Sequence, residues 1–239
     1  MENLVKNNFF QSLLFKVKEI YIYRSVLYQL VKQYLRLKYR RTILGYFWTL
    51  LNPILMILVL GIVFSSLLKK EFSNFLLILF AGLIPWNMFS QIVTQSLITF
   101  LNNEELIKKI YIPKILFPFS VSIAISIDSL IFFIVIFPIT FLIGAKLSLA
   151  LLILPLSYIL LFIFSFAISL IGSLICVFFR DFQWLVPVLL QALFFLTPIL
   201  YEKVNVSEFL AYFNYINPLS PFISIFKDPI YYGIFPDIE

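Results

Sequence analysis

The sequence contains no histidine and one cysteine, Cys176. A disulfide within the chain is therefore excluded, and a zinc site or a nucleophile activated by histidine is untenable. The Gly-x-x-x-x-Gly-Lys-Ser/Thr loop that cradles ATP phosphates is also absent. Acids outside the apolar runs are few and scattered, and none forms a paired-carboxylate motif. These absences argue against catalysis by this chain.

Charge is scarce as well. Only 13% of residues are charged while 62% are hydrophobic, and the mean hydropathy is +1.02. Soluble domains are roughly half apolar, so this composition indicates a membrane protein. The apolar runs are continuous rather than alternating, which favours helices over a barrel. We therefore expect an all-α polytopic membrane protein.

Five apolar segments are long enough to be predicted as membrane spans. They cover about 46–68, 75–100, 115–143, 147–179 and 182–200. The tail, 201–239, is apolar but broken by Pro218, Pro221, Pro229 and Pro236. It should form short surface or re-entrant helices on the outer side.

Basic residues are distributed unevenly between the two sides. Residues 1–41 carry nine of the eighteen lysines and arginines, and thirteen fall on the same side once the loops are assigned. The positive-inside rule then places the N-terminus in the cytoplasm, and five spans leave residue 239 outside.

The cytoplasmic N-terminus contains an amphipathic helix. An apolar stripe follows helical spacing and consists of Leu27, Leu30, Val31, Tyr34 and Leu37. A basic stripe recurs every four residues and consists of Lys32, Arg36 and Arg40. Such a helix can lie at the membrane surface with its cations near anionic headgroups. It is either a plain positive-inside anchor or a docking surface for a partner.

The loop 102–114 is the most charged segment after the N-terminus. Glu104 and Glu105 precede Lys108 and Lys109 by four residues, the favourable order for helical ion pairs. We expect a short helix closed by Pro113. It is either a solvated loop helix or a docking element.

Polar groups inside the predicted spans need partners, because they are costly toward lipid. Asn87, Gln91 and Gln95 recur every four residues, and they either join helices or line a polar conduit. Asp128, the only acid in a span, is either a satisfied packing group or a functional residue. Small residues on 147–179 predict a close helix-packing face, made of Ser165, Ser169, Gly172, Ser173 and Cys176.

Several stretches together resemble the type-2 ABC transporter permeases that export polysaccharides such as O-antigen, capsule and teichoic acid. They are YRRTILGYFWTLLNPILM (39–56), LIPWNMF (83–89), NNEELIKKIYIPKILFP (102–118), FFRDFQWLVPVLLQALFFLTPILY (178–201) and NPLSPFISIFKDPIYYG (217–233). The resemblance covers nearly the whole chain in order.

The resemblance implies roles for particular residues. The helix near 24–41 would be the cytosolic interface helix, with Lys32, Arg36, Arg40 and Arg41. The loop 102–114 would be the helix that couples to the ATPase, with Asn103, Glu104, Glu105, Leu106, Lys108 and Lys109. Candidates for lining the conduit are Trp48, Asn87, Gln91, Trp184, Gln191 and Phe194, because sugar rings stack on aromatics and hydroxyls bind amides. Each aromatic could instead anchor at the membrane interface or serve packing.

The function implied by the resemblance is export of a lipid-linked polysaccharide across the bacterial cytoplasmic membrane. The chain would be a single transmembrane permease domain, 1–239, that forms a homodimer and pairs with a separate ABC ATPase. ATP and Mg²⁺ would bind that ATPase, with no cofactor and no nucleic acid on this chain. The family has a sixth span, which would begin where this sequence ends. The alternatives are a membrane-embedded glycan-modifying enzyme and a permease for a drug or small lipid.

Overall fold

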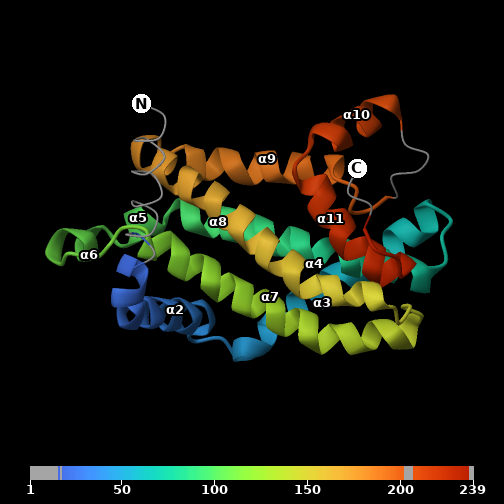
Figure 1. Cartoon of the computed structure of the whole chain (residues 1–239), viewed down its shortest axis with the longest axis horizontal. Helices are drawn as coiled ribbons and strands as arrows, with labels where there is room; N and C mark the ends of the chain where they lie inside the picture. The colour runs from blue at the N-terminus through green and yellow to red at the C-terminus, as the bar shows by residue number, and fades with distance from the viewer. Residues whose placement is uncertain (1–15, 17, 202–206, 237–239) are drawn as a thin grey trace.

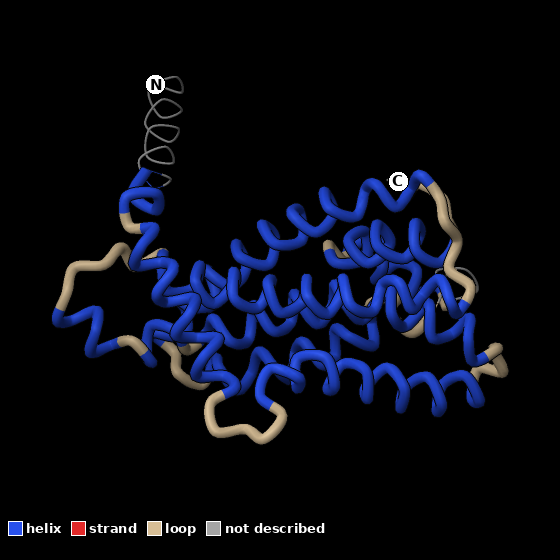
Figure 2. Tube along the Cα trace, turned by 90° about the horizontal axis from the view of Figure 1, so that it is seen from below, coloured by secondary structure: helices blue, strands red, loops and turns tan. Residues whose placement is uncertain are grey.

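The computed structural model describes residues 16, 18–201 and 207–236, which form helices and loops without a strand (Figures 1 and 2). The all-α prediction is confirmed for this part of the chain. The helices, labelled as in Figure 1, are α2 (Arg24–Tyr39), η1 (Gly45–Phe47), α3 (Trp48–Leu67), α4 (Phe72–Leu97), α5 (Thr99–Asn102), α6 (Glu104–Lys109), α7 (Leu116–Ile143), η2 (Leu149–Ile153), α8 (Leu154–Phe178), α9 (Phe182–Leu196), α10 (Glu208–Ile216), α11 (Leu219–Lys227) and the π-helical η3 (Asp228–Tyr232).

Within the described residues, four helical segments are long and apolar enough to cross a membrane. They are Gly45–Leu67, Phe72–Leu97, Leu116–Ile143 and Leu149–Phe178, and they match the first four predicted spans. The fifth, α9, is apolar but has 15 residues. A helix of that length rises only about 22 Å, less than the roughly 30 Å of a hydrocarbon core. Its crossing of the membrane therefore stays a prediction.

Helix α4 is the centre of the bundle. In its most apolar 18-residue window 78% of the residues are buried inside the chain, against 11% for Gly45–Leu67. It packs against α3, α7, α8, α9 and α11. The absence of a side chain at Gly82 allows this crowding, because a Cβ there would lie 3.3 Å from the backbone of Ile199. The chain therefore builds its core around α4 and leaves α3 largely exposed.

The small-residue face predicted on α8 is confirmed, and it packs against α4. All five of its residues, Ser165, Ser169, Gly172, Ser173 and Cys176, are buried. A Cβ on Gly172 would lie 2.8 Å from the Cδ2 atom of Leu97 on α4. Ser165 donates a hydrogen bond to the carbonyl of Leu161, one turn earlier, at 2.7 Å. The serines thus satisfy their hydroxyls within α8 and need no partner across the interface.

The bundle has two distinct ends (Figure 1). Helices α5 and α6 and the turn between α8 and α9 gather at one end, with α2 beside them. At the other end lie the turn between α3 and α4, the loop between α7 and α8, and the helices α10 and α11. Successive long helices therefore run in opposite directions between these two ends. We call the end that holds α5 and α6 the basic end.

The tail folds back onto the bundle as short helices, as predicted. Helix α11 packs against α4 and α8, and Lys227 at its end is only 6% exposed. The Lys227 Nζ atom donates hydrogen bonds to the carbonyls of Pro198 (2.7 Å), Ile199 (3.3 Å) and Tyr201 (3.0 Å). These carbonyls follow α9 and have no helical donor of their own. A lysine far along the sequence therefore anchors the turn that follows α9.

Candidate functional site

The short helix α6 presents charge at the basic end. Lys108 pairs with Glu104 at 2.5 Å and Lys109 with Glu105 at 3.3 Å, so both predicted i,i+4 pairs are confirmed. The pKa of Glu104 is lowered by the hydrogen bond and charge of Lys108, and further by Arg180. The helix ends at Lys109, earlier than the predicted closure at Pro113, because Ile110 already has extended backbone angles. An exposed helix with both signs of charge can dock against a partner protein.

A buried apolar cluster joins α6 to the rest of the molecule. Leu30 of α2, Phe100 of α5, and Leu116 and Phe117 of α7 form its core, with Leu106 and Ile107 of α6 packed against it. The rings of Phe100 and Phe117 meet edge to face with centroids 6.5 Å apart. The cluster therefore links α6 to α2 and α7 through packed side chains. We call these residues the basic-end cluster.

Helix α2 carries the predicted interface residues. Its apolar stripe is buried at Leu30 and Val31, whereas Leu37 is 56% exposed and lies outside the packed face. Arg36, Arg40 and Arg41 are exposed, and Lys32 is half-buried. Arg41 adopts a left-handed backbone conformation with a φ of 63°, which turns the chain after α2 toward α3. The basic stripe is therefore half-buried at Lys32 and exposed at Arg36 and Arg40. Asn103, at the start of α6, donates a hydrogen bond to the carbonyl of Thr99 at 2.8 Å.

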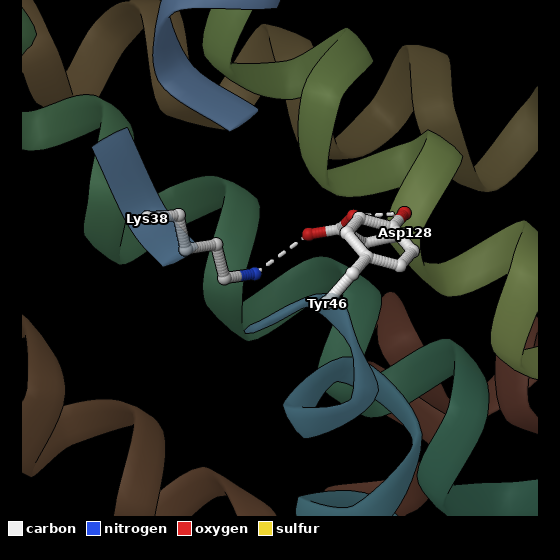
Figure 3. A network of polar contacts seen from close by, with 3 residues as sticks. All are labelled: Lys38, Tyr46 and Asp128. Atoms are coloured by element: carbon white, nitrogen blue, oxygen red, sulfur yellow. Dashed lines mark hydrogen bonds and ion pairs between the residues drawn. The ribbon is translucent and has the colours of Figure 1, made fainter. Parts of the chain in front are cut away.

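Asp128 on α7 is held by two groups from the N-terminal part of the chain (Figure 3). The Lys38 ammonium lies 2.7 Å from one carboxylate oxygen, and the Tyr46 hydroxyl donates to the other at 2.7 Å. The Asp128 side chain is 5% exposed, so its charge needs such partners. A single acid inside a predicted span is a sequence signal that a cation lies near it. Sequence reasoning missed that Lys38 is this cation.

A cavity of about 480 Å³, with both polar and apolar side chains in its walls, opens beside this ion pair, between α3, α4 and α7. It brings together three of the six conduit candidates, Trp48, Asn87 and Gln91. Asn52 and Ser129 add further hydrogen-bonding groups to the wall. Amides, hydroxyls and one indole ring are the groups that bind sugars. The third amide of the series, Gln95, instead lines a smaller cavity between α2, α4 and α7.

The other three conduit candidates lie on α9, away from this cavity. Phe194 is buried and its ring packs against Trp86 of α4 with centroids 5.5 Å apart. Trp184 is 73% exposed and Gln191 is also exposed, on the outside of the single chain. Phe194 therefore packs within the core, whereas Trp184 and Gln191 lie on the outer surface of the single chain.

Comparison with known proteins identifies close similarities. A family model described as "ABC-2 type transporter" matches residues 25–231. An O-antigen export system permease protein RfbA from Klebsiella pneumoniae is 31% identical over 201 residues, covering 84% of this chain and 78% of the relative. A protein of the same name from Myxococcus xanthus is 30% identical over 229 residues, covering 93% of this chain and 86% of the relative. The residues that the family model matches include α6, the basic-end cluster and all of α2 except its first residue.

Proposed function

The chain belongs to the ABC-2 type transporter family, and we propose that it is the permease subunit of an ATP-driven exporter of a lipid-linked polysaccharide. The substrate would move outward across the bacterial cytoplasmic membrane. Relatives that align with most of this chain are named O-antigen export permeases, which makes O-antigen the first candidate over capsule or teichoic-acid glycans. Asn52, Asn87 and Gln91 in the cavity beside Asp128 supply groups suited to hydroxylated sugar rings.

The energy source would be a separate ABC ATPase that binds ATP and Mg²⁺. The observation that carries this proposal is the exposed helix α6, which the basic-end cluster connects to α2 and α7. A partner that pushes α6 would thereby move two further helices. In this arrangement the N-terminus and α6 lie in the cytoplasm, as the positive-inside rule predicts.

Two copies of the chain would enclose the conduit. Helix α3 is long, apolar and mostly unburied, with Val59 59% exposed and Ile62 62% exposed. Helix α9 is shorter but is also apolar and mostly exposed, with Val188 64% exposed. These faces are available both to lipid and to a second copy. We propose that the homodimer covers part of them and that Trp184 and Gln191 face the conduit there.

Depletion of the protein in its native cell tests the export function. The lipid-linked glycan is then labelled with a membrane-impermeant probe, with and without restoration of the native chain. Full-length glycan that accumulates beyond the reach of the probe, and becomes accessible on restoration, supports export. Short or unmodified glycan already outside would contradict it and favour a glycan-modifying enzyme.

Cross-linking tests the ATPase contact separately. The Glu105 side chain is 90% exposed, whereas Cys176 is fully buried, so Glu105→Cys introduces one reactive thiol. A short cross-linker should join this variant to the ATPase in membranes. Lys146→Cys, exposed at the opposite end of the bundle, is the matched control and should remain unlinked. Equal cross-linking of both variants, or of neither, would contradict docking at α6.

A further inference from the structure

Two grooves lie along α2 and share the residues Lys32 and Arg36. The first, of about 660 Å³, lies between α2 and α7 and is mostly apolar. Its walls include Val31 and Leu35 of α2 and Ile127 of α7. The second, of about 540 Å³, is lined mainly by hydrogen-bond donors and cations, namely Gln29, Lys32, Gln33, Arg36 and Arg40. An apolar groove thus borders a cationic groove along one helix.

In the described part of the chain the cations at this border have no acidic partner, and the Lys32 ammonium lies 5.7 Å from the centre of the Tyr28 ring. Among the residues that the structure describes, no acid lines either groove, and neither Lys32 nor Arg36 forms an ion pair. Other lysines do have acidic partners, since Lys38 pairs with Asp128 and Lys108 pairs with Glu104. The two border cations therefore retain their charge for an external anion.

The shape and charge match one class of molecule. A phosphodiester accepts hydrogen bonds from guanidinium, ammonium and amide donors, all of which line the second groove. An acyl chain is stabilised by burial against branched aliphatic side chains, which line the first. A molecule with a phosphate adjoining a long apolar chain would occupy both grooves at once. Membrane phospholipids have this construction, and the positive-inside assignment places α2 next to their cytoplasmic leaflet.

We propose that the α2–α7 groove binds an anionic phospholipid of the cytoplasmic leaflet. Its phosphate lies on Lys32 and Arg36, and one acyl chain runs along Val31 and Ile127. The lipid ties α2 to α7 on a second side, in addition to the ion pair of Lys38 with Asp128. The site belongs to the single chain and does not depend on the substrate that the transporter carries.

Native mass spectrometry of the full chain in detergent tests the proposal directly. Phosphatidylglycerol or phosphatidylethanolamine is titrated in, and the bound lipid is counted. Phosphatidylglycerol should bind preferentially, and K32Q/R36Q should weaken its binding about thirtyfold, as expected when two surface cations are lost. The exchange K32R/R36K keeps both charges and should retain most of the binding. The control variant K69Q/K70Q removes the same charge from the turn between α3 and α4, which lies at the opposite end of the bundle from α2 (Figure 1). It should bind phosphatidylglycerol about as well as the native chain.

A second variant tests the acyl-chain part of the site. Ile127 is 38% exposed and lines the apolar groove, so I127W fills the groove while every cation is kept. Phosphatidylglycerol binding should fall, and the melting temperature without lipid should confirm that the variant folds. Unchanged binding in K32Q/R36Q or in a folded I127W would overturn the proposal. Binding of a polyprenyl pyrophosphate with no binding of phosphatidylglycerol would also overturn it, and would assign the groove to the substrate's anchor.

Discussion

Lys38 and Asp128 are ninety residues apart in the sequence, yet the ammonium of one lies 2.7 Å from the carboxylate of the other. The contact joins the end of the amphipathic helix α2 to the middle of the long helix α7. Tyr46, just before α3, binds the same carboxylate at 2.7 Å. One acid therefore fixes the position of the chain on both sides of the turn that leads into the membrane.

Removal of this acid should destabilise the protein. Asp128→Asn leaves the Lys38 ammonium without its counter-charge, and Lys38 is 31% exposed, so part of the charge can be solvated. We expect a cost of about 2 kcal/mol and a melting temperature lower by about 4 to 8 °C, measured by thermal unfolding in detergent. Asp181→Asn changes the same charge at an exposed position and should shift the melting temperature by less than about 1 °C. Equal shifts in the two variants would show that the ion pair contributes nothing.

The buried lysine of the tail should also be essential for stability. Lys227→Met keeps the apolar stem but leaves the carbonyls of Pro198, Ile199 and Tyr201 without this donor. We expect a loss of about 2 kcal/mol, seen as a lower melting temperature. Lys146→Met removes the same group from an exposed position and serves as the control. A melting temperature equal to that of the native chain would mean that the tail does not depend on this anchor.

Gly82 should tolerate no side chain. A Cβ at this position would lie 3.3 Å from both the Cα and the carbonyl oxygen of Ile199, and backbone atoms cannot move aside cheaply. Gly82→Ala should therefore cost about 1 to 3 kcal/mol. Gly172→Ala meets only the end of the Leu97 side chain and should cost less. The single buried thiol, Cys176, provides the measurement, because it reacts with a maleimide only when the bundle opens. Faster labelling of the Gly172 variant than of the Gly82 variant would contradict this order.

The basic-end cluster should couple ATP hydrolysis to transport. Leu30 is 9% exposed and belongs to the core of the cluster, so Leu30→Ala leaves a cavity between α2 and α7. We expect the assembled transporter to hydrolyse ATP but to export several-fold less glycan for each ATP. Leu37→Ala, on the same helix but 56% exposed, is the matched control and should keep the native ratio. If ATP hydrolysis and glycan export fell in proportion in the Leu30 variant, the cause would be misfolding instead of lost coupling.

The sequence by itself determined the elements and their type. Long uncharged runs can satisfy their backbone hydrogen bonds only as helices in a membrane, so the all-α class and four spanning segments followed from hydropathy. Local spacing also predicted the ion pairs of Glu104 and Glu105 and the small-residue face of α8, because these depend on the periodicity of one helix. The fifth span was predicted to reach residue 200, whereas α9 ends at Leu196, because apolar residues continue past this point into a non-helical turn.

Only the tertiary structure decided which helix faces meet. The sequence indicated that Asp128, an acid inside a span, needs a partner. However, nine cations lie in residues 1–41, and no periodic pattern selects Lys38 among them. Likewise, Trp48 and Asn87 share a cavity while Phe194 packs against Trp86, although all three lie in similar apolar sequence. The apolar groove beside α2 exists only because that helix packs on α7. Periodicity assigns a residue to a face of its own helix, whereas the neighbour of that face is set by packing between segments distant in the chain.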